Sequence, residues 1–307
     1  MKIIYLGTPE FAVKPLINLI NSHHEVVAVV TQPDRPVGRK GIITPPPVKV
    51  TAEKYGVPVY QFESISKEGV EVLSSLKADA MITCAYGQIL SKSVIEICPL
   101  GIYNIHASLL PKYRGASPIQ AVIINGEKTT GVTFMKTDVG LDTGDIVKSF
   151  PLDILKDETF GSLSERLSVL GAEKVVSVMD EIESGKATFI KQNDELSSVV
   201  KTIKNADCII DFSKTAEEVK NLINGLSPSP CAYTFLNGKR LKIYGATLSD
   251  ISGNKGEVVA ENGKIKVCSA VGSIEITSLQ EEGGKVMDAK SFILGRKIKT
   301  GDILGNA

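Results

Sequence analysis

The strongest constraint on the fold is a series of short apolar segments that alternate with amphipathic segments over the first 185 residues. The apolar segments are predicted to be buried strands at 2–6, 26–30, 80–83, 101–105, 131–135 and 146–152. Helical spacing of apolar residues predicts helices at 10–20, 48–55, 64–76, 91–97 and 160–183. This alternation predicts the α/β class, with a Rossmann-like, mostly parallel sheet and helices on both of its faces.

The pattern changes after residue 185. Residues 186–205 are polar and irregular, which predicts a linker. Residues 206–307 hold one predicted helix at 215–226, and short strands follow at 232–236, 241–246, 256–260, 265–268 and 274–279. The turns Asn237-Gly238 and Asn262-Gly263 are typical of tight hairpins. We therefore expect a first domain at 1–185 and a small OB-like β-barrel at 206–307.

Composition limits the class of protein. The 307 residues favour two domains, and 43% hydrophobic with 23% charged residues predicts a packed core. The five cysteines are odd in number and form no C-x-x-C pair, which argues against a disulfide framework and a clustered zinc site. No apolar run reaches the ~18 residues of a membrane span. We expect a cytoplasmic monomer that does not contact membranes.

Asn104 and His106 stand at the end of the predicted central strand. Side chains two residues apart on a strand point to the same face, and open parallel sheets bind ligands beyond the carboxyl ends of their strands. This spacing therefore places an amide and an imidazole together at an edge that forms sites. Taken alone, an Asn-x-His pair is more often a hydrogen-bonded loop element, so a structural role stays open.

A glycine-rich loop at 138–145 carries three aspartates, among them Asp142. Its spacing differs from that of an EF-hand, and a solvated hairpin is the alternative. We expect Gly140 and Gly144 to supply unusual backbone angles. Asp142 is predicted to turn inward and meet His106, where a carboxylate would favour and orient the imidazolium form.

The sequence lacks the motifs of several other enzyme classes. Residues 7–10 read Gly-Thr-Pro-Glu and lack the second glycine of a nicotinamide-binding turn, and no G-x-S-x-G elbow is present. Only three histidines occur, and we interpret His23-His24 as a solvated turn. We therefore expect no metal. The final helix of the first domain is predicted to be capped by Thr159 or Ser162, with Ser162 and Glu165 as a capping box.

Several linked segments together resemble the signature of the folate-dependent formyltransferase family. They are Asn104–Pro111, Arg114-Gly115, Gly131–Thr133 and Asp138–Asp145. Three further segments favour the branch of that family that acts on methionyl-tRNA: Gly7–Ala12, Thr31–Arg39 and Ala85–Leu90. The resemblance extends over the whole chain and is strongest from residue 1 to 150.

The resemblance implies transfer of a formyl group from 10-formyltetrahydrofolate, as co-substrate, to the methionine amino group of initiator methionyl-tRNA, for translation initiation. It implies that Asn104, His106 and Asp142 are catalytic. It also implies a folate pocket formed by Tyr86, Gly87, Gln88, Ile89, Leu90, Ser108, Leu109, Leu110, Pro111, Val139, Gly140 and Leu141.

The partner that the resemblance implies is tRNA. The formal net charge of the chain is zero, so the phosphates of the tRNA would have to contact local basic patches on the protein. The loop 34–48 resembles a tRNA-contacting insertion and contains Arg35, Arg39 and Lys40. In the C-terminal domain, the first of three basic clusters holds Lys239, Arg240 and Lys242, and the others lie at 264–266 and 296–299. For each cluster a solvated surface is the alternative.

We hypothesise that Asn104 and a protonated His106 donate hydrogen bonds to the oxyanion formed when the amine attacks the formyl carbon. Asp142 would keep His106 charged and relay the amine proton through water. Three alternatives stay open: a formyltransferase that uses the same donor with a small amine, a hydrolase of 10-formyltetrahydrofolate, and a non-catalytic RNA-binding protein with this fold.

Overall fold

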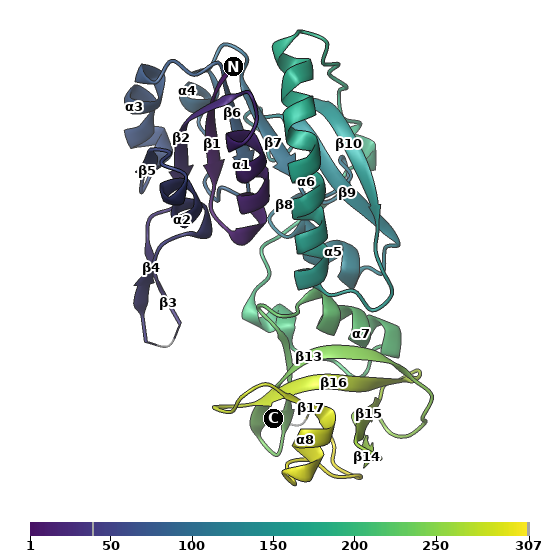
Figure 1. Cartoon of the computed structure of the whole chain (residues 1–307). Coiled ribbons are helices and arrows are strands. Elements are labelled where there is room, and N and C mark those ends of the chain that lie inside the picture. Colours follow the sequence, from purple (N-terminus) through teal and green to yellow (C-terminus); the bar gives the residue numbers. More distant parts are fainter. Residues whose placement is uncertain (39, 306–307) are drawn as a thin grey trace. The chain divides into compact units, whose positions relative to one another are not determined.

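The computed structural model describes residues 1–38 and 40–305, and the chain divides into two compact units (Figure 1). The first unit comprises Met1–Gly115, Thr130–Leu152 and Ser164–Val199. The second comprises 116–129, 153–163 and the chain from residue 200 onward. Two segments predicted to lie in the first domain thus belong to the second unit, and residues 186–199, predicted as linker, belong to the first.

A seven-stranded sheet forms the centre of the first unit. Its strands, in spatial order, are β10 (Ile146–Asp153), β9 (Thr129–Lys136), β7 (Ile102–His106), β6 (Ala80–Cys84), β1 (Lys2–Gly7), β2 (Glu25–Thr31) and β5 (Val59–Gln61). The five strands from β7 to β5 pair in parallel, and β9 runs antiparallel to β7. The predicted mostly parallel α/β sheet is confirmed.

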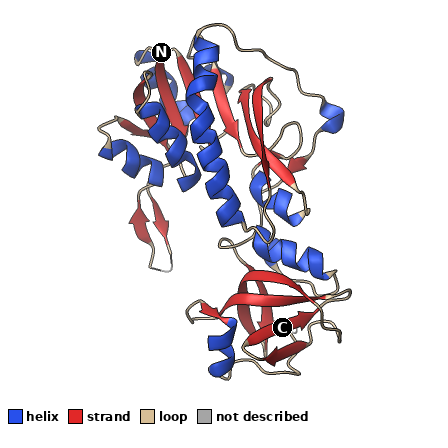
Figure 2. Cartoon of the chain, turned by 45° about the vertical axis from the view of Figure 1, so that its right-hand side comes forward, coloured by secondary structure: helices blue, strands red, loops and turns tan. Residues whose placement is uncertain are grey.

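Helices cover both faces of this sheet (Figure 2). On one face, Ile4 and Met81 pack in one apolar cluster with Ile65 and Leu73, which come from η2 (Ile65–Gly69) and α3 (Val70–Ser75). On the other face, the Tyr5 hydroxyl donates a hydrogen bond to the carbonyl of Ala12 at 2.7 Å. The remaining helices of this unit are η1 (Glu10–Ala12), α1 (Val13–Ile20), α2 (Pro47–Lys54), α4 (Lys92–Ile95), the 164–183 part of α6 (Phe160–Glu183) and η3 (Asp194–Leu196).

The side-chain alternation of β7 sets the position of the site. Gly171 of α6 lies so close to β7 that an added Cβ would come within 3.3 Å of the Ile105 side chain. Ile105 therefore faces α6, and its neighbours Asn104 and His106 point to the opposite face of the sheet.

The start of α6 corrects one prediction. The Thr159 hydroxyl accepts a hydrogen bond from the backbone N–H of Ser162 at 3.3 Å, and the Ser162 hydroxyl accepts one from the N–H of Thr159 at 3.0 Å. Glu165 instead pairs with Lys14. The predicted box of Ser162 with Glu165 is wrong, because Ser162 already occupies the third helical position, from which it reaches back to Thr159.

The second unit is built on a six-stranded antiparallel sheet. Its main path runs β12 (Ala232–Leu236), β13 (Lys239–Ser249), β16 (Ser273–Glu281), β15 (Lys264–Cys268) and β14 (Val258–Glu261), and β17 (Met287–Asp288) also pairs with β16. Both predicted hairpin turns are confirmed: Asn237, Gly238, Asn262 and Gly263 all have positive φ between 50° and 76°. The antiparallel strands agree with the short strands predicted for the C-terminal region, whereas its OB-like character stays a prediction.

Helix α7 (Ala216–Gly225) closes the core of this unit. Ala216, Val219 and Ile223 pack in the apolar cluster that the inner faces of the strands form. The unit also contains α5 (Pro118–Ile124), η4 (Asn205–Cys208) and α8 (Ala289–Leu294). Short strand pairs occur outside the two main sheets, β3 (Arg35–Val37) with β4 (Ile42–Thr44) and β8 (Arg114–Gly115) with β11 (Val199–Val200). No helix among the described residues is long and apolar enough to cross a membrane.

The N-terminus of α7 carries a complete capping box. The Thr215 hydroxyl accepts from the N–H of Glu218, and the Glu218 carboxylate accepts from the N–H of Thr215 at 2.9 Å. Thr215→Ala should therefore lower the free energy of unfolding by about 1 kcal/mol. Urea unfolding followed by circular dichroism measures this loss. Lys214→Ala, a change of an exposed neighbour, is the control, and equal losses in both variants would contradict the capping role.

Candidate active site

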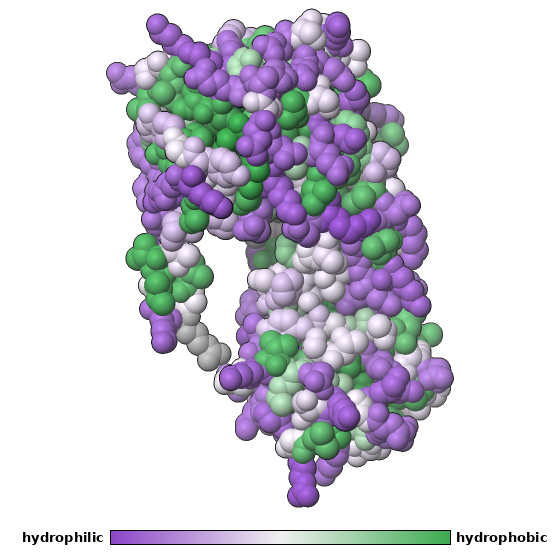
Figure 3. Space-filling model, in the orientation of Figure 1, coloured by the Kyte–Doolittle hydropathy of each residue, from purple (hydrophilic) through white to green (hydrophobic). Residues whose placement is uncertain are grey.

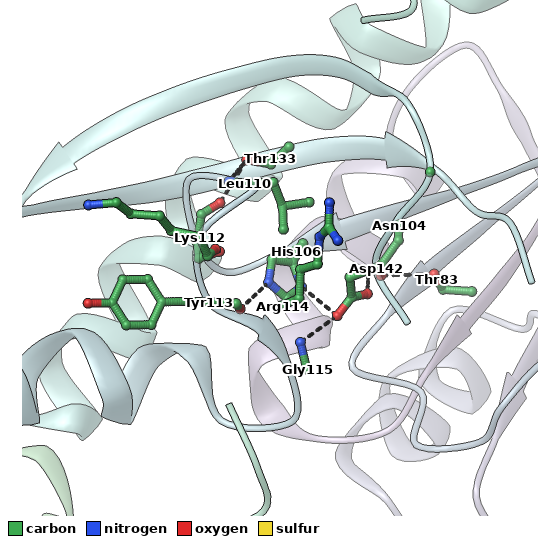
Figure 4. Close-up of polar contacts among 12 residues, drawn as sticks. Thr83, Asn104, His106, Leu110, Lys112, Tyr113, Arg114, Gly115, Thr133 and Asp142 are labelled. Atoms are coloured by element: carbon green, nitrogen blue, oxygen red, sulfur yellow. Dashed lines mark hydrogen bonds and ion pairs between the residues drawn. The ribbon is translucent and has the colours of Figure 1, made fainter. Parts of the chain in front are cut away.

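Asn104 is held by the neighbouring strand. The Thr83 hydroxyl on β6 donates a hydrogen bond to Asn104 Oδ1 at 2.9 Å. This bond uses the oxygen of the amide and turns Nδ2 toward Asp142, whose Oδ1 lies 3.4 Å away (Figure 4). The register of β6 and β7 pairs these same residues, so the orientation of the amide follows from the sheet.

His106 is buried, and one of its ring nitrogens is already engaged. Nε2 lies 2.9 Å from the carbonyl oxygen of Tyr113, which can only accept, so Nε2 carries a hydrogen. Nδ1 lies 3.6 Å from Asp142 Oδ2. Of the two ring nitrogens, only Nδ1 therefore faces the carboxylate. The predicted approach of Asp142 to His106 is confirmed by this distance.

Asp142 is the point on which the cluster converges. Its backbone has a φ of +53°, which is uncommon for a residue with a side chain. Its Oδ2 accepts a hydrogen bond from the N–H of Gly115 at 2.8 Å, and its side chain is 16% exposed. The carboxylate is thus held between a backbone donor on one side and the amide and imidazole on the other, with a small opening to solvent.

The two glycines of this loop act differently from the prediction. Neither Gly140 nor Gly144 has a positive φ among the described residues, and the unusual angle belongs to Asp142. A Cβ on Gly140 would lie 1.9 Å from the Thr143 hydroxyl oxygen, and one on Gly144 would lie 1.8 Å from the carbonyl oxygen of Lys136. The glycines are required because the loop folds tightly onto itself and onto β9.

A segment that the sequence predicted to be linker supports the loop. The Gln192 amide donates hydrogen bonds to the carbonyl oxygens of Asp142 at 2.9 Å and Gly144 at 2.7 Å. Its oxygen accepts from Nε of the buried Arg114 at 3.0 Å. Arg114 also pairs with Asp194 at 2.8 Å. Sequence reasoning missed Gln192, because a glutamine in an irregular polar stretch has no periodicity or motif that marks it.

The predicted folate residues divide into two sets. Ile89, Val139 and Leu141 are 88%, 74% and 58% exposed and offer apolar side chains on the loops after β6 and β9. Ser108 and Leu110 are buried instead, and the Ser108 hydroxyl donates to the carbonyl of Lys112. These two side chains hold the 108–112 loop together. The others in the set are Tyr86 (buried), Gly87, Gln88, Leu90, Leu109, Pro111 and Gly140.

Of the predicted tRNA residues in loop 34–48, Arg35 forms an ion pair with Glu63 and Lys40 is exposed, while Arg39 lies outside the described residues. The strands β3 and β4 form a hairpin here, which the sequence did not predict. Its side chains Val37, Ile42 and Ile43 are 56%, 62% and 61% exposed, and Figure 3 shows the apolar surface.

The basic clusters of the second unit differ in their ion pairs. Lys264, Lys266 and Lys297 each pair with a carboxylate, at 3.0, 3.3 and 2.9 Å. Among the described residues, Lys239, Arg240 and Lys242 form no ion pair. The Arg240 guanidinium instead lies 3.9 Å from the centre of the Tyr233 ring.

Comparisons with known proteins place this arrangement in a family. The profile described as Formyl transferase matches residues 1–179, and that of the Formyl transferase C-terminal domain matches residues 202–297. A protein of Geotalea daltonii named methionyl-tRNA formyltransferase is 45% identical over 100% of this chain and 99% of its own length. The chain belongs to the methionyl-tRNA formyltransferase family. A protein of Macrococcus caseolyticus with the same name is 43% identical over 96% of each chain.

A solved structure shares the fold of this chain. It is the crystal structure of an N-formyltransferase from Helicobacter canadensis, described as a complex with folinic acid and dTDP-3-aminofucose. Its TM-score is 0.70 at 21% identity, and the match covers 92% of this chain and 99% of the other. At that identity the likeness concerns the fold.

Removal of the Gln192 side chain should disturb the Asp142 loop. Gln192→Ala leaves two carbonyls and the buried Arg114 Nε–H without their partner, which should lower the free energy of unfolding by about 1–3 kcal/mol. Displacement of Asp142 should lower kcat for formyl transfer by about 100-fold and change KM less. Steady-state kinetics and urea unfolding measure both effects.

Lys191→Ala is the matched control, because this neighbouring side chain is exposed. A Gln192→Ala variant that keeps wild-type kcat would show that the Asp142 loop is positioned without this amide.

Proposed function

We propose that this chain transfers the formyl group of 10-formyltetrahydrofolate to the amino group of methionine on initiator methionyl-tRNA, for translation initiation. The observation that carries the proposal is the convergence of Asn104 Nδ2 and His106 Nδ1 on the Asp142 carboxylate, at 3.4 and 3.6 Å, in a member of the methionyl-tRNA formyltransferase family. This cluster combines two hydrogen-bond donors with a proton acceptor, which acyl transfer to an amine requires.

The donor groups suit a developing oxyanion. When an amine attacks a formyl carbon, the carbonyl oxygen gains negative charge, and preorganised N–H groups lower the barrier. Asn104 is preorganised because Thr83 fixes its oxygen, and its Nδ2 carries two hydrogens. His106 cannot turn its ring without breaking the 2.9 Å contact with the carbonyl of Tyr113. We assign Asn104 and the Nδ1 side of His106 to oxyanion stabilisation.

We assign Asp142 to proton transfer. The amine loses a proton as its nitrogen bonds to the formyl carbon, and the leaving nitrogen gains one as its bond to that carbon breaks. A carboxylate held by the N–H of Gly115 but still 16% exposed can accept the proton directly or through water. Its Oδ2 also lies 3.6 Å from Nδ1 of His106 and so orients the imidazole ring.

The folate co-substrate fits the apolar loops beside this cluster. Its flat ring system needs apolar surface, and Ile89, Val139 and Leu141 expose such surface on the loops after β6 and β9. Backbone groups of 86–90 and 139–142 would supply the polar contacts. The solved Helicobacter canadensis relative was crystallised with folinic acid, which supports a folate site in this fold.

We assign tRNA binding to the C-terminal domain, 206–307, as an OB-like barrel, and catalysis to the domain predicted at 1–185. The basic cluster 239–242 supports this assignment. The register of β12 with β13 pairs Tyr233 with Lys242 and Phe235 with Arg240, so aromatic and basic side chains alternate across two strands. Tyr233 is buried and Phe235 packs against the core, so the cluster would contact tRNA through its positive charge, at the phosphates. The loop 34–48 would add Arg35, Arg39 and Lys40, and the protein would act as a monomer in the cytoplasm.

Loss of the catalytic groups should affect turnover more than binding. Asn104→Ala should lower kcat by roughly 100- to 1000-fold, because one oxyanion donor is removed. Asp142→Asn should lower kcat by at least about 100-fold, because an amide cannot accept the proton. The assay measures transfer of labelled formyl from 10-formyltetrahydrofolate to methionyl initiator tRNA, with methionyl elongator tRNA as the control.

Selective transfer to the initiator is expected. Hydrolysis of the donor, or formylation of a small amine without transfer to tRNA, would refute the proposed acceptor. Equal losses of kcat and of folate affinity in Asn104→Ala would contradict its role in oxyanion stabilisation.

Replacement of Lys239, Arg240 and Lys242 by alanine should weaken tRNA binding. Each phosphate contact removed should reduce the slope of log affinity against log salt concentration by about one. Filter binding at several salt concentrations measures the slope. The matched control is the double variant Lys264→Ala with Lys266→Ala, since both lysines are already paired with carboxylates. An unchanged slope in the triple variant would exclude this cluster from the tRNA contact.

A further inference from the structure

Four side chains that could bind a metal gather in the first unit, away from the cluster around Asp142. His23 and His24 lie in the turn between α1 and β2, and Asp180 and Glu183 lie in the last turn of α6. One ligand atom from each residue lies within 4.8 Å of the ligand atoms of the other three. The set combines two imidazoles with two carboxylates.

Both imidazoles approach the same carboxylate oxygen. Nε2 of His23 lies 2.8 Å, and Nε2 of His24 3.2 Å, from Asp180 Oδ1. The two rings lie 4.3 Å apart between their centres. Ligands around a tetrahedral Zn²⁺ are bonded at about 2.0–2.2 Å and therefore stand roughly 3.3–3.5 Å from one another. The two distances to Asp180 Oδ1 are near that separation, and Oε2 of Glu183 lies 3.7 Å from Nδ1 of His24.

His24 corrects the prediction of a solvated turn. Its side chain is fully buried, and although Asp180 Oδ1 lies 3.2 Å from its Nε2, this nitrogen forms no hydrogen bond among the described residues. Burial of a ring nitrogen without a partner is unfavourable, and buried polar atoms in proteins usually have one. The unsatisfied nitrogen points to a ligand that this cluster would accept.

The end of α6 also favours a cation. Asp180, Glu181 and Glu183 stand in its last turn, which has no basic residue. Carboxylates at a helix C-terminus are unfavourable, because the helix dipole already places partial negative charge there. Glu181 is compensated by Lys148, and Glu183 Oε1 by the Met1 amino group at 2.9 Å. The second oxygen of Glu183 lies 3.7 Å from Nδ1 of His24, and Asp180 faces the two histidines, so neither carboxylate has a lysine or arginine partner among the described residues.

The Met1 amino group contacts two of the four residues of the cluster. It lies 3.4 Å from Nδ1 of His24, which is the ring nitrogen opposite the one near Asp180. It therefore contacts the outer side of the His24 ring and one oxygen of Glu183. It forms no hydrogen bond or ion pair with His23 or Asp180 among the described residues.

We propose that His23, His24, Asp180 and Glu183 bind one Zn²⁺ ion. Zinc suits the donor set, since imidazole and carboxylate are among its ordinary ligands and four coordination is its preferred number. The ion would join the turn before β2 to the end of α6 and satisfy the buried nitrogen of His24. This site is separate from the proposed catalytic cluster, so the role of the metal is structural.

Titration of the full chain with Zn²⁺ tests the proposal. The protein is first treated with a chelator, and binding is followed by calorimetry and by competition with a chromophoric chelator. We expect one Zn²⁺ per chain and a rise of Tm that increases with Zn²⁺ concentration. Mg²⁺, which prefers oxygen ligands, should not compete.

Variants of the half-exposed or exposed ligands identify the site without disturbing the core. His23→Ala and Asp180→Asn should each weaken Zn²⁺ binding by at least about tenfold and abolish the Tm shift. Glu173→Gln is the matched control, because this exposed carboxylate of α6 lies outside the cluster. Absence of stoichiometric binding, or binding that His23→Ala and Asp180→Asn leave unchanged, would overturn the proposal.

Discussion

The arrangement around Asp142 depends on a carboxylate held in place by backbone geometry. The backbone of Asp142 has a φ of +53°, which is sterically unfavourable for a residue with a side chain. That conformation brings the carboxylate back toward β7. The N–H of Gly115 then holds Oδ2 at 2.8 Å. Without this position, the amide of Asn104 and the imidazole of His106 would face an open loop. The geometry of the candidate site therefore follows from one loop conformation.

That loop conformation is in turn determined by contacts from distant parts of the chain. Gly140 and Gly144 permit close contacts that any side chain would block. Gln192, fifty residues after Asp142, holds two loop carbonyls and is itself held by the buried Arg114. A largely buried polar network of this kind has few alternative arrangements, because a broken bond within it leaves an unsatisfied group. The network explains why an irregular polar segment packs against the site.

Ion pairs distinguish basic clusters that are similar in the sequence. Lys264 and Lys266 stand opposite carboxylates, so much of their charge is compensated within the protein. Arg240 lies over an aromatic ring and keeps its charge for an outside partner. The same reasoning applies at the end of α6, where carboxylates exceed the basic groups near them and a cation would be stabilised. In both places, the charge that no neighbouring side chain compensates indicates the kind of partner better than the number of charged residues does.

The sequence by itself determined the mostly parallel sheet, the two hairpins at Asn-Gly, and the pairing of Asn104 with His106 on one face. Each depends on local periodicity or on turn residues with a strong backbone preference, which act over a few positions. Only the tertiary structure decided that Gln192 supports the loop, that Thr159 rather than Ser162 starts α6, and that His24 is buried. The contacts of Gln192 and the burial of His24 depend on residues far apart in the chain, about which local patterns carry no information. The cap of α6 is local, but the sequence offers two hydroxyls near the helix start and only the structure shows which of them caps it.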